Sequence, residues 1–432
     1  MKAETIQKLH RWHAWSGLIF GANLILFSFT GAVLVFYAEL NRAVGPRPPQ
    51  ALLAAMAARD GGAGKLAVGE RAFDSGARAR LPVIDERGWV PLQPLLTEIL
   101  GDYPGARLAH LQLAPARESQ AEIHKDLDRF HRLDIDLPAA GELAQSSSEA
   151  GEAEHINIYI DPASGLHARA DERPDPLRWI FHLHATFFAG STGKTLLGFV
   201  ALALLVSSVT GVIIYWPFSK AQSFRAPATL IRNGGAGRRL YFADWHKLIG
   251  ILSFAFQMLM AVTGLLLTFG TLVIQIYTYV LISELDRQAS DSVNPTDWVA
   301  LDRVYASARK IHGDERYIKT ILFPGEVQGP RHFGVLAYGT GTFGQYIPQL
   351  SMLRAARDAE AAADMIIELP WYIKLIAAAA PLHFGNFGGL PLKIIYCVFG
   401  LTGGGLAITG YIMYFKKIRR RRREAASKLG AS

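Results

Sequence analysis

The stretch RWHAWSGLIFGANLILFSFTG, residues 11–31, indicates the architecture of the whole chain. It places His13 at the start of an apolar run and Thr30-Gly31 late in that run, and the pattern returns 233 positions further on. The matching positions are Trp12 with Trp245, His13 with His246, Gly17 with Gly250, Thr30 with Thr263 and Gly31 with Gly264. Such a repeat is typical of a protein built from two copies of one unit.

A second pattern repeats at an offset of 199 positions. The matching positions are His184 with His383, Gly190 with Gly389, Thr210-Gly211 with Thr409-Gly410, and Tyr215 with Tyr414. In this pattern the histidine again precedes the threonine, by a longer interval than in the first pattern. Four apolar runs therefore each have a histidine before them and a Thr-Gly step late in the run.

The length of these runs predicts a membrane protein. Of the 432 residues, 50% are hydrophobic and only 19% are charged. The charge-free runs are Ala14–Ala38, Thr195–Ser219, Leu248–Ser283 and Ile394–Phe415, and each exceeds the roughly 20 residues that cross a bilayer. We predict four transmembrane helices over 12–38, 195–217, 243–271 and 391–415. The first run is too long for a cleaved signal peptide.

Basic residues predict the orientation. Lys and Arg gather in 1–11, 218–242 and 416–432, which the positive-inside rule assigns to the cytoplasm. The long connections 39–194 and 284–390 then lie outside, in the periplasm of a bacterium with the protein in its inner membrane. The net charge of +8 comes largely from these flanks and fits lipid headgroups rather than nucleic acid. Cys397 is the only cysteine, and no Cys-x-x-Cys-His exists, which excludes covalent c-type haem.

Both outside connections have mixed helix and strand patterns. The first predicts a helix over 89–100, strands over 107–113 and 155–160, and a turn at DPASG, 161–165; the second predicts a helix over 297–312, strands over 316–323 and 332–338, and a polar helix over 351–364. The helix, strands and Asp-Pro-x-Ser-Gly turn of the first resemble a PepSY domain. The aromatic segments 178–188 and 371–387 are too short to span and are expected at the membrane interface. The fold class is thus a four-helix membrane bundle from two repeated halves, with two extracytoplasmic α+β PepSY-like domains.

Four histidines are the candidate ligands. Ionisable residues at membrane depth are uncommon and are usually functional. The repeat pairs His13 with His246 near the cytoplasmic face and His184 with His383 near the outer face. Two imidazoles that face each other across a helix bundle are what a six-coordinate b-type haem needs, whereas zinc needs three or four protein ligands. The Thr-Gly steps fall at the same two levels, where glycine would let a flat macrocycle approach the backbone.

Other interpretations of these histidines stay open. Two haems are the first interpretation, a single haem is the second, and purely structural histidines are the third. Thr-Gly steps also serve helix packing in membranes. His10 and His182 match Ala243 and Pro381, so they are poorer ligand candidates. The remaining histidines show no metal-binding spacing: His110, His124, His131, His155, His167, His312 and His332.

The chain resembles the PepSY-associated transmembrane family of bacterial inner-membrane proteins. The resemblance rests on KLHRWHAWSGLIFGANLILFSFTGAVLVF, YIDPASGLHARA, FHLHATFFAG, ADWHKLIGIL and PLHFGNFGG. It implies an iron-regulated, haem-containing ferric-siderophore reductase that passes electrons across the membrane. His13 and His246 would be ligands of the inner haem, and His184 and His383 ligands of the outer one. The second outside region lacks the PepSY turn.

The resulting hypothesis is a haem-dependent oxidoreductase that reduces a periplasmic ferric siderophore. No Gly-x-Gly-x-x-Gly follows a strand, so a membrane quinol or a separate cytoplasmic reductase must be the electron donor. No catalytic acid, base or nucleophile is needed. The alternatives are a non-redox sensor or inhibitor that binds a periplasmic partner, and a siderophore transporter. Against transport, the four charge-free runs offer no charged residue that would bind a polar substrate.

Overall fold

The computed structural model describes residues 3–44, 49–60, 67–68, 71–72, 89–114, 130–137, 154–170, 176–221, 238–287, 298–324, 332–339, 344–355 and 365–429. Its contacts divide the chain into two compact units. The helical unit consists of residues 1–40, 176–272 and 378–432. The sheet unit consists of residues 41–175 and 273–377. Basic residues of the predicted cytoplasmic loop, in 222–237, lie outside the described residues.

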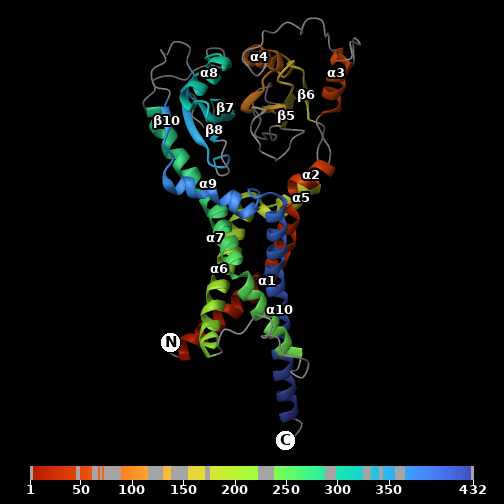
Figure 1. Ribbon diagram of the computed structural model, residues 1–432, viewed down its shortest axis with the longest axis vertical. Helices are drawn as coiled ribbons and strands as arrows, with labels where there is room; N and C mark the ends of the chain where they lie inside the picture. The colour runs from red at the N-terminus through yellow and green to blue at the C-terminus, as the bar shows by residue number, and fades with distance from the viewer. Residues whose placement is uncertain are drawn as a thin grey trace, which may run out of the picture. The chain divides into compact units, whose positions relative to one another are not determined.

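Four long helices dominate the helical unit (Figure 1). They are α1 (Ala3–Leu34), α6 (Gly190–Ala221), α7 (Arg238–Arg287) and α10 (Gly389–Leu429), with the last part of α7 assigned to the sheet unit. Each contains a segment long and apolar enough to cross a membrane. Helix α1 packs against both α6 and α10. The short helix α2 (Tyr37–Val44) follows α1.

The helices differ from the predicted spans at their ends. Helix α1 ends at Leu34 rather than at 38, and α6 continues through position 217 to Ala221 although Pro217 was expected to end it. Helix α7 starts before 243 and runs well beyond 271, to Arg287. An apolar run marks where lipid can surround the chain, whereas backbone hydrogen bonds extend a helix through polar residues at either end. A proline removes one backbone donor and need not stop a helix.

The two aromatic segments expected at the interface form short helices before α6 and α10. They are α5 (Pro176–Thr186) and α9 (Trp371–Phe384). Helix α5 belongs to the helical unit. Phe187 and Phe188 follow α5 with positive φ angles of 49° and 60°, a conformation that is strained for bulky residues. The turn after α9 uses Gly385 at φ 64° instead. Tyr396 of α10 donates a hydrogen bond of 2.8 Å to the Leu382 carbonyl, next to His383.

The sheet unit contains one open antiparallel sheet of eight strands. Its order is β10-β9-β8-β7-β3-β4-β5-β6. The strands are β3 (Arg107–Gln112), β4 (His131–Leu137), β5 (Glu154–Ile160), β6 (His167–Arg169), β7 (Arg316–Leu322), β8 (His332–Gly339), β9 (Gln349–Arg354) and β10 (Met365–Ile367). Helix α4 (Leu92–Asp102) precedes the first four strands and α8 (Leu301–His312) precedes the last four. Helix α3 (Gln50–Asp60) and the strand pair β1 (Ala67–Val68) and β2 (Arg71–Ala72) complete the unit.

The prediction of two separate outside domains is therefore wrong in one respect, because both contribute to one sheet. We call α4 with β3–β6 the first lobe and α8 with β7–β10 the second lobe. Strand β3 pairs with β7, with Leu111 opposite Ile321. One hydrophobic core joins residues of both lobes, such as Ile99 and Leu133 with Val304 and Phe333. Burial of apolar surface from both lobes in one core stabilises them together.

The two lobes also cap each other's helices. Neither α4 nor α8 has a side-chain hydrogen bond from its own N-cap residue, Pro91 or Ala300. Instead, the Asp302 carboxylate of α8 accepts the amides of Leu92 (2.7 Å) and Gln93 (3.0 Å) in α4. The Gln93 side-chain oxygen accepts the amide of Leu301 at 2.8 Å in return. Each helix thus satisfies backbone donors that the other leaves free.

The second lobe also differs from its predicted secondary structure. It has one helix and four strands in the same order as the first lobe, although it lacks the Asp-Pro-x-Ser-Gly turn. The polar helix predicted over 351–364 is wrong at its start, where 351–354 belong to β9, while 356–364 lie outside the described residues. Ser351 is fully buried, so the polar composition of this stretch does not mark an exposed face. In the first lobe the predicted turn is present, with the Gly165 amide bound to the Asp161 carbonyl at 2.8 Å.

Candidate functional site

The four predicted histidines meet in two pairs inside the helical unit. The ring centres of His13 (α1) and His246 (α7) are 6.0 Å apart, with ring planes at 85°. The ring centres of His184 (α5) and His383 (α9) are 6.5 Å apart, with ring planes at 56°. The structure thus brings together the residues that the repeat matched. In each pair, one histidine comes from the first half of the sequence and the other from the second half.

A threonine from another helix binds each histidine of the His184–His383 pair. His184 Nδ1 lies 2.7 Å from Thr30 Oγ1 of α1. His383 Nδ1 lies 2.9 Å from Thr263 Oγ1 of α7. Both threonines come from the Thr-Gly steps that the spacing placed at this level. The sequence pattern alone did not reveal that these threonines are histidine partners.

The His13–His246 pair has the same kind of partners. His246 Nδ1 lies 2.9 Å from Thr409 Oγ1 of α10. His13 Nδ1 lies 3.0 Å from the Ser207 carbonyl of α6 and 3.3 Å from Thr210 Oγ1. Ser16 Oγ and Ser207 Oγ form a further hydrogen bond of 2.6 Å beside His13. The corresponding positions in the repeat are Ile249 and Leu406, so the repeat gave no signal for this polar contact.

These contacts determine the tautomer of each histidine. Every one of the four threonines donates its hydroxyl proton to a backbone carbonyl of its own helix, as Thr30 does to Leu26 (2.9 Å) and Thr263 does to Leu259 (2.6 Å). The hydroxyl oxygen is then left to accept a proton from Nδ1 of the histidine. With Nδ1 protonated, the lone pair of a neutral imidazole is on Nε2, the nitrogen that can bind a metal ion. A hydrogen-bond partner on the other ring nitrogen orients metal-binding histidines in the same way.

The glycine of each Thr-Gly step lies beside the ring of the histidine that its threonine binds. A Cβ atom on Gly31 would lie 3.1 Å from Cε1 of His184, and one on Gly211 would lie 3.2 Å from Cε1 of His13. At Gly264 and Gly410 the corresponding distance is 3.8 Å. Gly31 and Gly211 therefore make room for the imidazole beside its threonine partner, whereas a Cβ at Gly264 or Gly410 would make ordinary contact.

The spacing of each pair suits one shared metal ion. Two imidazoles that bind one ion, each through a nitrogen about 2 Å from it, have ring centres about 6 Å apart. No group of three or more His, Cys, Asp or Glu side chains that could hold a metal ion occurs within the described ranges. Each pair therefore offers two nitrogen ligands, the number that a six-coordinate haem takes from a protein. The residues fit such a cofactor and do not form a zinc site of the usual kind.

The histidines judged to be poorer candidates have other contacts. His182 Nε2 accepts a hydrogen bond of 3.4 Å from Arg178. In the sheet unit, His110 and His155 pair with Asp134 and Asp136, at 2.5 and 2.8 Å. These pairs lie on adjacent strands, where they bind side chains of the same sheet.

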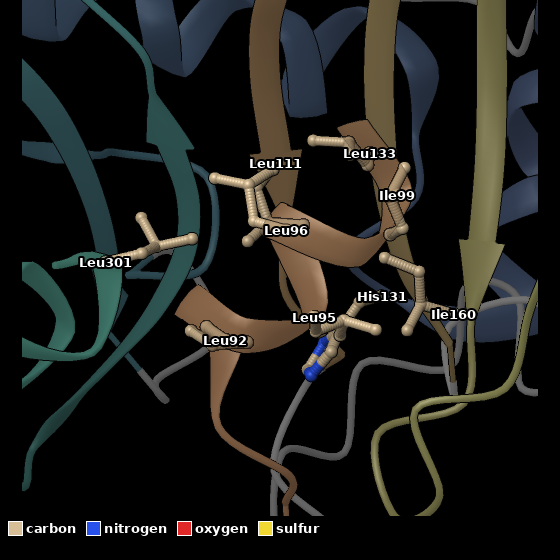
Figure 2. A pocket seen from close by; sticks show the side chains of 9 residues that line it. All are labelled: Leu92, Leu95, Leu96, Ile99, Leu111, His131, Leu133, Ile160 and Leu301. Atoms are coloured by element: carbon tan, nitrogen blue, oxygen red, sulfur yellow. The ribbon is translucent and has the colours of Figure 1, made fainter. Parts of the chain in front are cut away.

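Among the described histidines of the sheet unit, His131 is the most deeply buried. Its Nδ1 accepts the Ala114 amide at 2.9 Å, so its proton is on Nε2, which has no hydrogen-bond partner among the described residues. Figure 2 shows it among the aliphatic side chains around a small cavity; the lining residues are Leu92, Leu95, Leu96, Ile99, Leu111, Leu133, Ile160 and Leu301. Burial lowers the pKa of His131 from 6.5 to about 3, so its imidazole is neutral.

Comparisons with known proteins agree with the architecture. The family model described as the PepSY-associated TM region matches residues 10–417, which include all four charge-free runs and all four paired histidines. No protein of the curated set matches the chain. The match and the four apolar helices make this a multi-pass membrane protein, and the chain belongs to the family of PepSY-associated transmembrane proteins.

Proposed function

We propose that the two histidine pairs bind two b-type haems and that the protein transfers electrons across the bacterial inner membrane. The observation that carries this proposal is the arrangement of the four Nδ1 atoms. Each is bound to an oxygen of another helix, which leaves Nε2 as the free ligand in both pairs. Bound haem would supply a reversible one-electron iron couple at each level.

The chain's own residues hold the two sites at different depths. His13 begins the apolar part of α1, and Thr30, which binds His184, lies near the other end of the same helix. At 1.5 Å per residue, the two levels are roughly 25 Å apart along this helix, close to the thickness of the hydrocarbon layer of about 30 Å. The threonines and glycines orient the rings at each level. Two sites near opposite faces are suited to passing electrons from one side to the other.

The proposed direction of electron flow rests on the charge pattern, and the proposed partners rest on the resemblance to ferric-siderophore reductases. With both termini in the cytoplasm, His13 and His246 would receive electrons from a quinol or a cytoplasmic reductase. His184 and His383 would pass them to a periplasmic acceptor, for which we propose a ferric siderophore. Reduction to Fe(II) weakens such a chelate because hard oxygen ligands bind the harder Fe(III) ion more tightly. The sheet unit is then the periplasmic part of an oxidoreductase made of two repeated halves.

The test is an absorption spectrum of the purified protein in detergent, oxidised and reduced, with haem counted per chain. We expect two low-spin b-type haems. His246→Ala and His383→Ala should each remove one haem while the other keeps its spectrum. A protein that holds no haem, purified from cells well supplied with it, would overturn the proposal and favour a sensor that binds a partner. Uptake of the chelate into vesicles without a reductant would favour a transporter.

A further inference from the structure

Two lysines occupy matching places near the start of α6 and of α10. Lys194 and Lys393 are 199 positions apart, which is the interval of the second repeat pattern. Each follows a glycine with a positive φ angle by four residues: Gly190, at 52°, precedes Lys194, and Gly389, at 63°, precedes Lys393. The two helices therefore begin with the same kind of turn, and the lysines lie at equivalent positions in the two halves.

In the first half, Lys194 lies close to the end of α5 that carries His184. A Cβ atom on Gly193, the residue before Lys194, would clash with the carbonyl oxygen of Thr186. The first turn of α6 therefore rests directly against the last residue of α5, two positions after His184. This contact brings the start of α6 to the level of the His184–His383 pair.

In the second half, Lys393 lies close to the end of α9 that carries His383. Tyr396 of α10 comes three residues after Lys393, so the two side chains are neighbours on the helix surface. The Tyr396 hydroxyl donates to the Leu382 carbonyl at 2.8 Å, and the Tyr396 ring lies against Gly385. Tyr396 thus contacts residues before and after His383, and Lys393 lies about one helical turn from these contacts.

Lys393 is more enclosed than lysines usually are. Its exposed fraction is 8%, and it is the one buried Lys or Arg among the side chains that the structure describes. Its Nζ lies 2.6 Å from Oε1 of Glu39 in α2, whose side chain is 40% exposed. A buried ammonium group is costly unless acceptors surround it, and it has three protons to donate. One carboxylate oxygen therefore leaves donors on Lys393 for a further anion.

The ion pair with Glu39 does not account for both lysines. In the repeat, the position that corresponds to Glu39 is Leu272, which cannot form an ion pair with Lys194. Within the described residues, Lys194 has no ion pair or hydrogen bond from its side chain. With the predicted topology, both lysines also lie at the outer ends of their spans, where the positive-inside rule does not favour them. The repeated feature is thus the cation and not the pair.

We propose that Lys194 and Lys393 bind the two propionate groups of the outer haem, one each, an inference that rests on the proposed function. The propionates lie side by side on one edge of the haem ring. Carboxylates are costly in hydrocarbon, so this edge would face the nearer polar surface, where the two lysines lie. An ammonium group that donates to a carboxylate forms one of the stronger hydrogen bonds in proteins.

The symmetry of haem matches that of the chain. A two-fold axis through the propionate edge exchanges the two propionates and, at the same time, the two axial ligands. The halves of a parallel repeat are related by an axis along the membrane normal. The relation that pairs His184 with His383 therefore also pairs Lys194 with Lys393. Each half would supply one axial ligand and one propionate partner.

The lysines would also influence the direction of electron transfer. A nearby positive charge favours the reduced iron, because reduction removes one positive charge from the haem. Lys194 and Lys393 should therefore raise the midpoint potential of the outer haem. An electron is then more stable at the outer level than it would be without them, which favours transfer toward the periplasmic acceptor.

Resonance Raman spectra and potentiometric titration of the purified, haem-loaded protein test this inference. We expect Lys194→Met and Lys393→Met each to shift the propionate bending band and to lower the midpoint potential of the haem that His383→Ala removes. The other haem should keep both values. Lys194→Arg and Lys393→Arg keep the charge and should keep the potential close to that of the unmodified protein. The matched control is Lys374→Met, which removes a lysine of α9 that is 48% exposed and lies 3.6 Å from Glu368. It should leave the band unchanged.

A double variant, Glu39→Gln with Lys393→Met, separates the propionate contact from the ion pair. If Lys393 served only to pair with Glu39, removal of both charges would restore the propionate band. We expect the band to stay shifted, as in Lys393→Met alone. A restored band in the double variant, or an unchanged band in either single lysine-to-methionine variant, would overturn the inference while both haems stay bound. A chain that binds no haem would overturn it together with the proposed function.

Discussion

The four paired histidines of the helical unit and His131 of the sheet unit are all enclosed by other side chains, but their hydrogen bonds leave the lone pair on opposite ring nitrogens. In the helical unit, a threonine or carbonyl oxygen accepts the Nδ1 proton of each histidine, and the free lone pair on Nε2 can bind a metal ion. In the sheet unit, the Ala114 amide donates to Nδ1 of His131, which fixes the proton on Nε2. In these five histidines the group that faces Nδ1 therefore decides whether Nε2 has a free lone pair.

The largest expected effect separates the two kinds of histidine directly. His184→Ala should remove one of the two proposed haems, because the remaining His383 cannot supply both axial ligands. His131→Leu should leave the haem content unchanged, because its Nε2 carries a proton and lies in an aliphatic cavity. Haem per chain, measured by absorption after extraction into pyridine, checks both. A loss of haem in the His131 variant would contradict the distinction.

The second effect is the response of the sheet unit to acid. The folded-state pKa of His131 is lowered to about 3 from 6.5, so between these values the unfolded chain binds a proton that the folded chain does not. The free energy of unfolding then falls as pH drops below 6.5, by about 1.4 kcal/mol per pH unit at most, and the loss ends near pH 3. Hydrogen exchange of the Ala114 amide and of strand β3 measures this change.

The matched variant for that experiment is His131→Leu, which removes the titrating group and keeps an aliphatic neighbourhood. We expect it to flatten the pH dependence of exchange in β3 and β4. A remaining slope is expected from His312, whose pKa burial also lowers. An unchanged slope in β3 and β4 would mean that His131 is not the group that titrates.

A smaller effect tests the threonine partners. Thr30→Val keeps the shape of the side chain and removes the oxygen that accepts the Nδ1 proton of His184. We expect haem at this level to bind about 10- to 100-fold more weakly, with an altered midpoint potential. Thr271→Val is the control, because Thr271 donates to the Leu267 carbonyl of its own helix and its hydroxyl has no histidine partner among the described residues. Potentiometric titration compares the two variants.

The smallest effect concerns the glycines and distinguishes the two halves. A Cβ on Gly31 would lie 3.1 Å from the His184 ring, which is tighter than ordinary contact, whereas one on Gly264 would lie 3.8 Å from the His383 ring. Gly31→Ala should therefore shift the spectrum of the proposed outer haem, and Gly264→Ala should leave it nearly unchanged. The reverse order of effects would show that the imidazoles occupy other positions when the cofactor is bound.

Some features of this protein could be predicted from the sequence alone. The four apolar segments are a property of local composition, and the requirement for about 20 residues to cross lipid made them visible. The repeat matched His13 with His246 and His184 with His383, and equal positions in two copies of a unit meet at equal depth. The Asp-Pro-x-Ser-Gly turn at 161–165 was predicted because its residues act on their immediate neighbours in the chain.

Other features depended on contacts between distant segments. That Thr30 would bind His184, and thereby fix its tautomer, depends on how α1 and α5 pack, over 154 positions of sequence. The joining of two lobes by β3 and β7, and the capping of α4 by Asp302, likewise connect residues about 210 positions apart. A hydrogen bond needs its two atoms within about 3 Å at a set angle, and local patterns of polarity contain no such information. The tertiary structure alone therefore determined which nitrogen of each of these histidines has the free lone pair.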